Sequence, residues 1–249
     1  MKTWRYALLG LAMVASAQQQ KGMNFYSVDK ELALGKQLAQ QTDSQTTPLS
    51  NAVVSSYVQR IIGELAALIP SAPFAYVVTV VKDKLGPEPT TLPGGYLYVS
   101  ASQIAEARSE SEFVGLLAHA MAHSADRDPT RIATRGDVLQ IATIPVRAMD
   151  NATLRQNMLQ QMQLSTVSFT RQYETEADEL AVKAMAAAGF YPADLAQYVE
   201  RTTKSDGFPG WESSEQTRLT QLRREASKVT VTPSSDGLEF ARVQAAIGN

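Results

Sequence analysis

The chain has 249 residues, of which 44% are hydrophobic and 19% are charged, and its formal net charge is −2. This composition is typical of a globular protein and provides enough apolar side chains for a sizeable core. A near-neutral balance without a basic stretch excludes nucleic acid as an expected partner. The chain contains no cysteine, which excludes disulfides, cysteine metal ligands and a lipid-attachment cysteine.

The first residues have the pattern of a secretory signal peptide. Lys2 and Arg5 precede an apolar run over residues 7–15, and residues 15–17 read ASA, a small-x-small cleavage motif. A membrane anchor is the alternative, but this run is much shorter than the roughly 20 residues that span a bilayer. We therefore predict a signal peptide over residues 1–17, a mature chain without a transmembrane anchor, and a periplasmic or secreted protein.

The first half of the mature chain is predicted to form two helices followed by two strands. Hydrophobic periodicity predicts a helix over residues 27–41, with Ser27 as its N-cap, that ends in the polar stretch TDSQTTP. The same periodicity predicts a second helix over residues 50–68. Residues rich in β-branched and aromatic side chains predict strands over 74–81 and 96–100, separated by a loop rich in proline and glycine.

The second half of the chain is predicted to be helical. Ser109 and Glu112 form an S-x-x-E capping box before an apolar run, which predicts a helix buried on most of its circumference. Residues 229–249 are weakly patterned. Without an internal repeat or a long linker, residues 18–249 are expected to form one mostly helical α+β domain with a small sheet. The further predicted helices cover 131–169, broken near Pro145, then 173–189 with Gly189 as C-cap, 193–203, and a solvent-facing segment over 213–226.

The two histidines of the chain, His119 and His123, lie four residues apart in the segment FVGLLAHAMAHSADRD. On a helix this spacing places both imidazoles on one face, one turn apart, where both can bind a single zinc ion. The alternative is a pair of core histidines whose nitrogens are satisfied by hydrogen bonds. Two adjacent buried imidazoles need four polar partners if neutral and repel each other if protonated, which favours the metal.

A zinc ion needs a third protein ligand, and in a chain without cysteine this ligand is a carboxylate. The segment RQYETEADELAV provides several acidic side chains on a predicted helix. Glu174 and Asp178 share a face at i, i+4 spacing, so Glu174 is the candidate ligand and Asp178 the candidate acceptor for the distal nitrogen of a ligand histidine. Glu176 projects about 160° away and is expected to be solvated. Taken alone, an acidic helix is more often a surface helix.

Four segments resemble, in order, the zinc metallopeptidases of the HtpX/BepA/Oma type, a gluzincin family. They are NFYSVDKELALGKQLAQQ, LPGGYLYVS, EFVGLLAHAMAHSADRD and TRQYETEADELAVKAMAAAGFYP, and the resemblance runs from about residue 24 to 226. It implies a gluzincin-type fold with a small sheet packed against the active-site helix. It also implies a Zn²⁺ cofactor held by His119, His123 and Glu174, with Asp178 supporting a ligand histidine.

The resemblance further implies a substrate-binding strand. Tyr96, Leu97 and Tyr98 would lie on an edge strand against which an extended peptide substrate pairs. Ordinary strand packing is the alternative for Leu97 and Tyr98. Arg218 fits the pattern of the last helix of the family, but the His-Pro element that many relatives carry before that helix is absent, and residues 211–218 read WESSEQTR.

The resemblance fails at one position of the active-site helix. The family motif is His-Glu-x-x-His, whose glutamate polarises the zinc-bound water and carries its proton to the leaving amine, whereas this chain has Ala120. A methyl group does neither, and general acid-base help contributes about 10² to 10⁴ in rate. Three accounts stay open: an enzyme disabled by substitution, a natural pseudopeptidase, and, least favoured, replacement by a neighbouring acid such as Asp126.

The resemblance therefore implies a zinc-dependent endopeptidase of the cell envelope that acts on unfolded or misassembled polypeptides. Hydrolysis is expected to be absent or strongly impaired because Ala120 replaces the general base, whereas zinc binding does not need that glutamate. The expected partners are polypeptide substrates or clients and envelope-assembly proteins. The alternative function is a non-catalytic, zinc-stabilised pseudopeptidase that binds polypeptides or acts like a chaperone, and a metal-free structural domain is the third alternative.

Overall fold

The computed structural model describes residues 23–69, 72–147, 152–202, 211–234 and 237–247. The predicted signal peptide, residues 1–17, lies outside these ranges. In the part of the chain that is described, no helix has both the length and the apolar character needed to cross a membrane.

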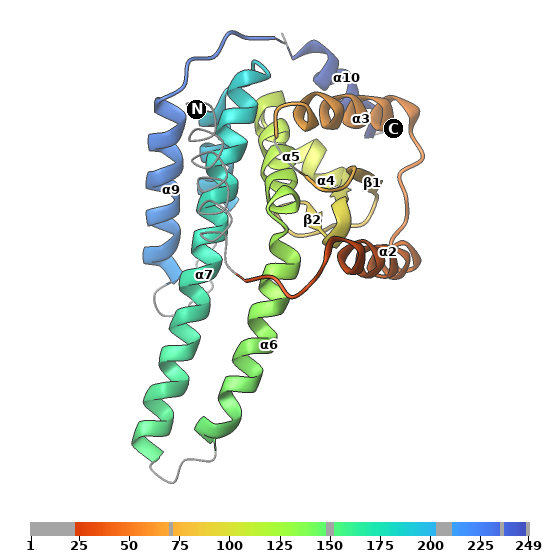
Figure 1. Cartoon of the computed structure of the whole chain (residues 1–249). Coiled ribbons are helices and arrows are strands. Elements are labelled where there is room, and N and C mark those ends of the chain that lie inside the picture. The colour runs from red at the N-terminus through yellow and green to blue at the C-terminus, as the bar shows by residue number, and fades with distance from the viewer. Residues whose placement is uncertain (1–22, 70–71, 148–151, 203–210, 235–236, 248–249) are drawn as a thin grey trace, which may run out of the picture.

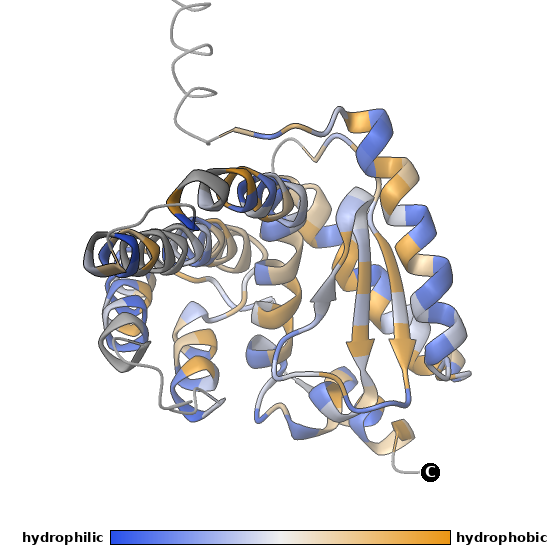
Figure 2. Cartoon of the chain, turned by 90° about the horizontal axis from the view of Figure 1, so that it is seen from below, coloured by the Kyte–Doolittle hydropathy of each residue, from blue (hydrophilic) through white to orange (hydrophobic). Residues whose placement is uncertain are grey.

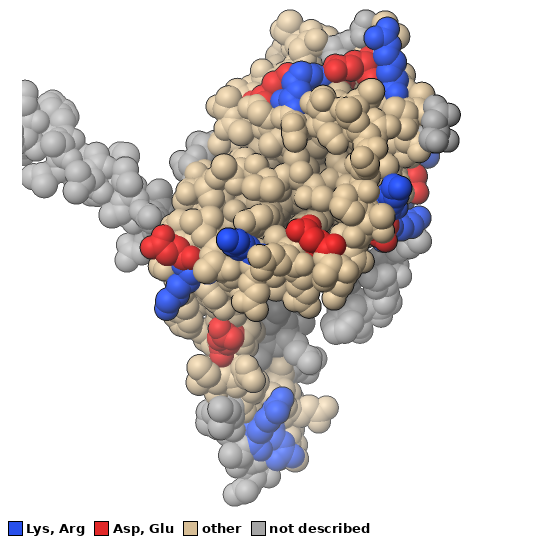
Figure 3. Space-filling view, turned by 90° about the vertical axis from the view of Figure 1, so that its right-hand side faces the viewer, with Lys and Arg blue, Asp and Glu red and all other residues tan. Residues whose placement is uncertain are grey.

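The described chain has an α+β fold that is mostly helical, as predicted, with one small sheet beside the central helices (Figure 1). Hydrophobic residues are concentrated along the strands, and α2 runs beside the sheet (Figure 2). Charged side chains of both signs are scattered over the face shown in Figure 3. In chain order the elements are α2 (Val28–Gln45), α3 (Ala52–Ala66), β1 (Val77–Val81), β2 (Thr90–Thr91), a 3₁₀ turn (Pro93–Gly95), β3 (Tyr96–Ser100), α4 (Ala101–Glu106), α5 (Glu110–Ala125), α6 (Asp128–Arg147), α7 (Ala152–Ala187), α8 (Pro192–Thr202), α9 (Trp211–Ser227) and α10 (Leu238–Ile247).

The sheet has the strand order β1-β3-β2, with β3 parallel to β1 and antiparallel to β2. The prediction that residues 96–98 lie on an edge strand is therefore wrong. Thr90 and Thr91 pair with Tyr98 and Leu97 and cover that edge of β3. A strand of two residues is too short to show an alternating pattern, so the sequence placed it in a loop.

The side chains of β3 pack inside the protein. Leu97 is fully buried in the main core, and Tyr98 packs on the other face of the sheet against Ala39 of α2. The Tyr98 hydroxyl donates to Asp43 Oδ1 at 2.7 Å. Tyr96 is half-buried beside the same cluster. These contacts favour the packing alternative for Leu97 and Tyr98.

Helix α2 begins at the predicted N-cap, since the Ser27 side chain accepts from Lys30 N. It continues to Gln45, four residues beyond the predicted end. In this last part the Thr42 hydroxyl donates to the Leu38 carbonyl and the Thr46 hydroxyl to the Thr42 carbonyl. Gly35 lets this helix approach the Pro93–Gly95 turn. A Cβ at Gly35 would lie 2.0 Å from the Pro93 carbonyl oxygen.

Helix α5 is the central helix of the fold, and all its residues except His123 are buried, as its apolar sequence predicted. The Ser109 side chain accepts from Glu112 N, which forms half of the predicted capping box. The second half differs from the prediction: the Glu112 carboxylate accepts from Arg108 N and from the Arg201 guanidinium of α8. This ion pair ties the start of α5 to α8.

Helices α6 and α7 extend away from the sheet as a long antiparallel pair (Figure 1). The predicted break near Pro145 agrees with the end of α6 at Arg147. Helix α7 differs from the prediction, since it is one helix of 36 residues that joins two predicted segments. Gly189 follows α7 in the left-handed conformation, with φ of 84°, as a C-cap glycine does.

The two C-terminal helices also differ from the sequence analysis. Arg218 and Leu222 of α9 are buried against the rest of the protein, so α9 is solvent-facing on its outer side alone. The weakly patterned tail forms α10, which buries Phe240 and Val243 and packs against α3. Both helices are positioned by contacts with distant segments, which local patterning does not reveal.

Candidate metal centre

Helices α5 and α7 pack side by side and bring His119, His123 and Glu174 together. His119 Nε2 lies 2.9 Å from His123 Nε2 and 3.3 Å from Glu174 Oε2, and His123 Nε2 lies 3.6 Å from Glu174 Oε1. Atoms that share a zinc ion at about 2.0 to 2.2 Å lie no more than roughly 4 Å apart. The three residues predicted as ligands therefore converge at a spacing that suits one cation.

Two buried carboxylates face the distal nitrogens of the histidines. His119 Nδ1 lies 2.9 Å from Asp178 Oδ1, and His123 Nδ1 lies 2.8 Å from Asp128 Oδ2. A carboxylate at this distance favours the proton on Nδ1 in each imidazole. The Nε2 lone pairs then point at the same place 2.9 Å apart, where they repel each other unless a positive charge lies between them.

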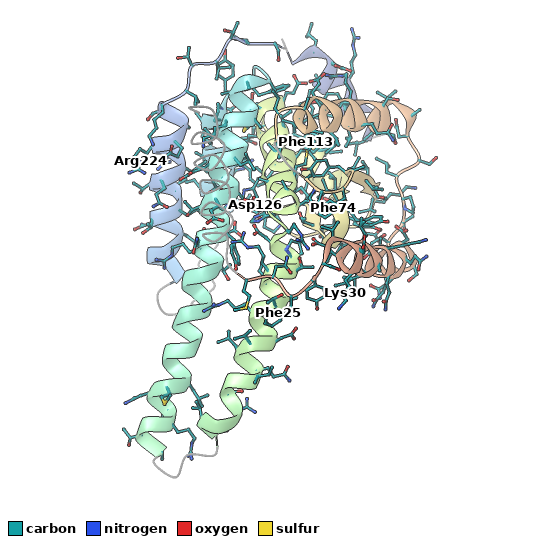
Figure 4. The ribbon with its side chains drawn as sticks, viewed as in Figure 1. Phe25, Lys30, Phe74, Phe113, Asp126 and Arg224 are labelled. Carbon is teal, nitrogen blue, oxygen red and sulfur yellow. The ribbon has the colours of Figure 1, made fainter. Side chains whose placement is uncertain are left out.

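The placement of Asp178 agrees with its predicted position behind a ligand histidine, whereas Asp128 was missed. Asp126, which the sequence analysis considered as a replacement acid, is the C-cap of α5 (Figure 4). The acid that contacts His123 is Asp128, the first residue of α6. The sequence SADRD contains both aspartates, and the turn between the two helices decides which of them faces the histidine.

That turn is held in an uncommon backbone conformation. Arg127 has a φ of 61°, in the left-handed region that non-glycine residues rarely adopt. Its guanidinium donates to Glu31 Oε2 at 2.6 Å and to the Tyr26 carbonyl at 2.7 Å. Thr130 donates to the same carboxylate of the fully buried Glu31. These bonds fix the turn that directs Asp128 toward His123.

The site favours positive charge. Burial lowers the pKa of His119, but the carboxylates of Glu88, Asp178 and Glu174 outweigh burial and raise it to about 10. Burial and the neighbouring His119 lower the pKa of His123, yet Asp128 and Glu174 raise it overall. Burial raises the pKa of Glu174, and the two histidines lower it by more.

One buried oxygen supports a cation directly. Glu174 Oε2 is buried and makes no hydrogen bond to any described residue, although the Arg218 guanidinium lies 3.0 Å from it. It faces His119 Nε2 at 3.3 Å, so two nitrogen lone pairs and a carboxylate oxygen surround one point. Zinc takes imidazole nitrogen and carboxylate oxygen as ligands. A divalent cation would satisfy all three atoms, and the residues therefore fit the group that the sequence predicted.

Arg218 of α9 lies against this cluster. Its guanidinium donates to both Asp178 oxygens, at 2.8 and 3.0 Å, and its Nη1 lies 3.0 Å from Glu174 Oε2. The sequence had indicated Arg218 through its position in the last helix. By binding Asp178 and Glu174 together, this buried cation holds the two carboxylates of α7 in place.

Ala120 lies on α5 between the two histidines and is 2% exposed. Its backbone carbonyl accepts from the Thr91 hydroxyl of β2 at 3.3 Å, so α5 and the edge strand meet here. Glu176, expected to be solvated, is only 31% exposed, because it accepts from Gln172 and lies 3.5 Å from the buried Arg131.

A groove of about 660 Å³ opens beside the cluster. Its walls come from residues 84–88, from α4, and from α8 and α9, and it reaches Glu174 and Arg218. Glu88, which was not predicted as a site residue, belongs to these walls and lies 3.7 Å from His119 Nε2. It stands alone between two prolines, a pattern that indicates a loop and no function.

The sequence profile of peptidase family M48 matches residues 48–226, more than half of the chain. The chain belongs to peptidase family M48. The match covers both α5 and most of α9, as well as all of α7, so every residue of the cluster lies inside the M48 region. Family membership agrees with the resemblance that the sequence motifs indicated.

Two relatives of this M48 chain have names that describe proteases. A protein of Vibrio cholerae serotype O1, provisionally named beta-barrel assembly-enhancing protease, is 24% identical over 190 residues, which cover 70% of this chain and 38% of the relative. The mitochondrial metalloendopeptidase OMA1 of Schizosaccharomyces pombe is 26% identical over 155 residues, which cover 62% of this chain and 45% of the relative. The chain thus spans less than half the length of either relative.

Proposed function

We propose that this M48 chain is a zinc metalloendopeptidase of the cell envelope whose hydrolytic step is absent or strongly impaired because of Ala120. The observation that carries the proposal is the convergence of two imidazole Nε2 atoms and the Glu174 carboxylate within 2.9 to 3.6 Å. A catalytic zinc site with two histidines and one glutamate uses this donor set.

The residues of the site have separate roles in this proposal. His119, His123 and Glu174 would hold the zinc ion, which when bound polarises a peptide carbonyl and lowers the pKa of water. Asp178 and Asp128 orient the two imidazoles from behind. Ala120 has no group that accepts a proton, at the position where the family motif has glutamate. The chain therefore keeps the binding residues and lacks the residue that moves the proton.

The adjoining groove supports a polypeptide as the substrate or client. It lies directly beside Glu174 and Arg218, and its walls carry both apolar and charged side chains. An unfolded or misassembled polypeptide offers extended backbone to such a groove. The predicted signal peptide and the name of the Vibrio relative support the periplasm as the location and envelope-assembly proteins as partners.

The decisive experiment restores the missing base. Ala120→Glu should produce zinc-dependent cleavage of an unfolded casein substrate, with a rate about 10² to 10⁴ above the chain with Ala120. Ala120→Gln is the matched control, because it has the same size and no basic carboxylate. A second control, His119→Ala added to Ala120→Glu, should abolish the new activity.

Two results would contradict the proposal. If Ala120→Glu binds zinc and casein but cleaves nothing, the chain is a polypeptide-binding pseudopeptidase. If the purified chain takes up no stoichiometric zinc, and a chelator leaves its unfolding temperature unchanged, both metal-dependent functions are wrong. N-terminal sequencing of the exported chain tests the location, with cleavage after Ala17 as the expected result.

A further inference from the structure

Glu31 of α2 is a charged side chain that the fold buries completely. Its exposed fraction is 0%, although its chain neighbours Lys30 and Leu32 are exposed. Its Oε2 atom pairs with Arg127 at 2.6 Å and accepts from the Thr130 hydroxyl at 3.0 Å. Burial of a charge is costly, and an apolar side chain in its place is often at least as stabilising. Stability therefore does not explain this carboxylate, whereas the geometry of its partners can.

Both partners of Glu31 belong to the junction between α5 and α6. Arg127 is the residue between the C-cap of α5 and the first residue of α6, and it has a φ of 61°. A residue with a Cβ adopts this left-handed conformation at a cost, so other contacts must hold it there. The Arg127 guanidinium supplies them, because it bonds to Glu31 and to the Tyr26 carbonyl at once. The conformation of the turn thus depends on α2 and on the segment before it.

The segment that leads into α2 crosses the start of α6 (Figure 4). Asn24 Nδ2 donates to the Thr130 hydroxyl and the Phe25 amide donates to the Thr134 hydroxyl, both at 2.9 Å. Thr130 and Thr134 lie one turn apart on the buried side of α6. Residues 24–31 therefore hold the first two turns of α6 beside α2.

The turn also places the carboxylate that faces His123. Asp128 follows Arg127 directly, and its Oδ2 lies 2.8 Å from His123 Nδ1. Its other oxygen accepts from Arg131 at 2.7 Å, and the Arg131 guanidinium lies 4.3 Å from the centre of the Tyr173 ring. Arg131 thus fixes the direction of the Asp128 side chain, whereas the turn fixes the position of its backbone.

His119 does not share this connection to α2. Its distal nitrogen faces Asp178 of α7 at 2.9 Å, and Arg218 of α9 holds that carboxylate with two hydrogen bonds. Neither residue belongs to α2, to the turn or to α6. A disturbance at Glu31 should therefore reach one imidazole of the metal centre and leave the other in place.

We propose that Glu31 is a positioning residue of the metal centre, which acts through Arg127 and the turn to hold Asp128 behind His123. The inference rests on the proposed zinc site. With the turn held, Asp128 keeps the proton of His123 on Nδ1 and leaves Nε2 free for the metal. Without Glu31, the turn relaxes toward the conformations that residues with a Cβ prefer, and Asp128 moves away from the imidazole.

The test uses the full mature chain, isotopically labelled at its histidine ring nitrogens and loaded with one equivalent of Zn²⁺. Proton–nitrogen NMR spectra then show His119 and His123 alone, because the chain contains two histidines. Glu31→Gln should speed the exchange of the His123 Nδ1 proton with water about tenfold or more, and it should leave the His119 proton unchanged. It should also lower the Zn²⁺ affinity about tenfold, the smaller end of the loss expected when the acceptor behind a ligand histidine is disturbed.

Asp43→Ala is the matched control for a loosened α2. Asp43 is another carboxylate of this helix, it accepts from the Tyr98 hydroxyl at 2.7 Å, and it lies about three turns beyond Glu31. Its removal weakens the attachment of α2 to the sheet without touching the turn. Both imidazole protons should therefore exchange as they do in the unchanged chain, and the Zn²⁺ affinity should be retained.

A second pair of variants isolates the backbone of the turn. Arg127→Ala and Arg127→Gly both leave Glu31 without the cation that it pairs with, but glycine adopts a positive φ freely. Arg127→Ala should therefore disturb the His123 proton as Glu31→Gln does. Arg127→Gly should disturb it less, because the turn then keeps its conformation without an anchor.

The outcomes distinguish this inference from the proposed function. If Glu31→Gln binds Zn²⁺ and matches Asp43→Ala in proton exchange and affinity, the positioning role is wrong and the zinc site stands. If both imidazoles change together in Glu31→Gln, the variant loosens the whole core and the positioning role is overturned. Equal effects of Arg127→Ala and Arg127→Gly would refute the route through the turn. If the unchanged chain takes up no stoichiometric Zn²⁺, the proposed function and this inference are both wrong.

Discussion

The ion pair between Glu112 and Arg201 joins the start of α5 to α8, and its removal provides a quantitative test of the fold. The buried Glu112 carboxylate accepts two hydrogen bonds from Arg201, at 2.7 and 2.8 Å, and a third from Arg108 N at 2.7 Å. Glu112→Ala removes all three bonds. Because α5 carries both histidines, this change also loosens the helix on which the metal centre depends.

The expected loss in the free energy of unfolding follows from these contacts. Removal of one partner from a buried ion pair costs about 3 to 5 kcal/mol, because the other charge is left unpaired. The Arg201 side chain is 24% exposed, so water recovers part of that cost, which places the expected loss near 3 kcal/mol. This expected loss includes the contribution of the hydrogen bond from Arg108 N.

Urea denaturation followed by circular dichroism measures this loss in the free energy of unfolding. The comparison holds if the slope of that free energy against urea concentration is the same in both chains. Glu200→Ala is the control, since Glu200 of α8 pairs with Arg223 at 2.6 Å and both side chains are more than half exposed. An exposed pair contributes about 0 to 1 kcal/mol. If Glu112→Ala costs no more than this control, the reasoning that α8 anchors α5 through a buried charge is refuted.

Three further predictions concern acid stability, helix packing and the central strand. Burial raises the pKa of Glu112, but the Arg201 guanidinium and the Arg108 amide lower it by more, so that it lies below its ordinary 4.5. The charged Glu112 therefore stabilises the fold fully above pH 4.5, and this stabilisation is lost as the pH falls through the pKa of the folded state. In urea denaturation between pH 6 and pH 3, Glu112→Ala should consequently lose less stability than the unchanged chain. Gly35→Ala should lower the free energy of unfolding by about 3 kcal/mol or more, because the new Cβ meets the Pro93 carbonyl. Gly63→Ala is the control, since nothing lies within 4 Å of a Cβ at that position. In thermal denaturation this control should be neutral or stabilising by up to about 1 kcal/mol. Tyr98→Phe should cost about 1 kcal/mol through the lost bond to Asp43 and leave casein affinity unchanged, and a loss of casein affinity at native stability would restore Tyr98 as a substrate contact.

The features that local geometry controls were predictable from the sequence. A spacing of four places His119 above His123 and Glu174 above Asp178 on any α-helix, so the two halves of the cluster were evident before the fold was known. The burial of α5 followed from its apolar sequence, and the caps at Ser27 and Ser109 followed from residue type. Convergence of the two helices does not follow from local geometry, and it was expected from the need of zinc for a third ligand and from the family resemblance.

The errors arose where a segment depends on a distant partner. The position of β3 in the sheet was mistaken because β2 has two residues, too few for a pattern, and pairs through backbone atoms that carry no sequence signature. Helix α10 was missed because its stability comes from packing Phe240 and Val243 against other helices. The signal peptide and the cell-envelope location remain predictions.

Short-range hydrogen bonds and sterics define the α-helix, so the sequence by itself determined which side chains share a helix face. It also showed directly that position 120 holds alanine where the family motif has glutamate. Tertiary structure alone decided which other charges reach that face. Asp128 arrives through a turn that Arg127 and Glu31 hold, and Glu88 through a loop that Gln103 and Tyr198 anchor. Such contacts join residues far apart in the chain, and their geometry depends on how whole elements pack rather than on any local pattern.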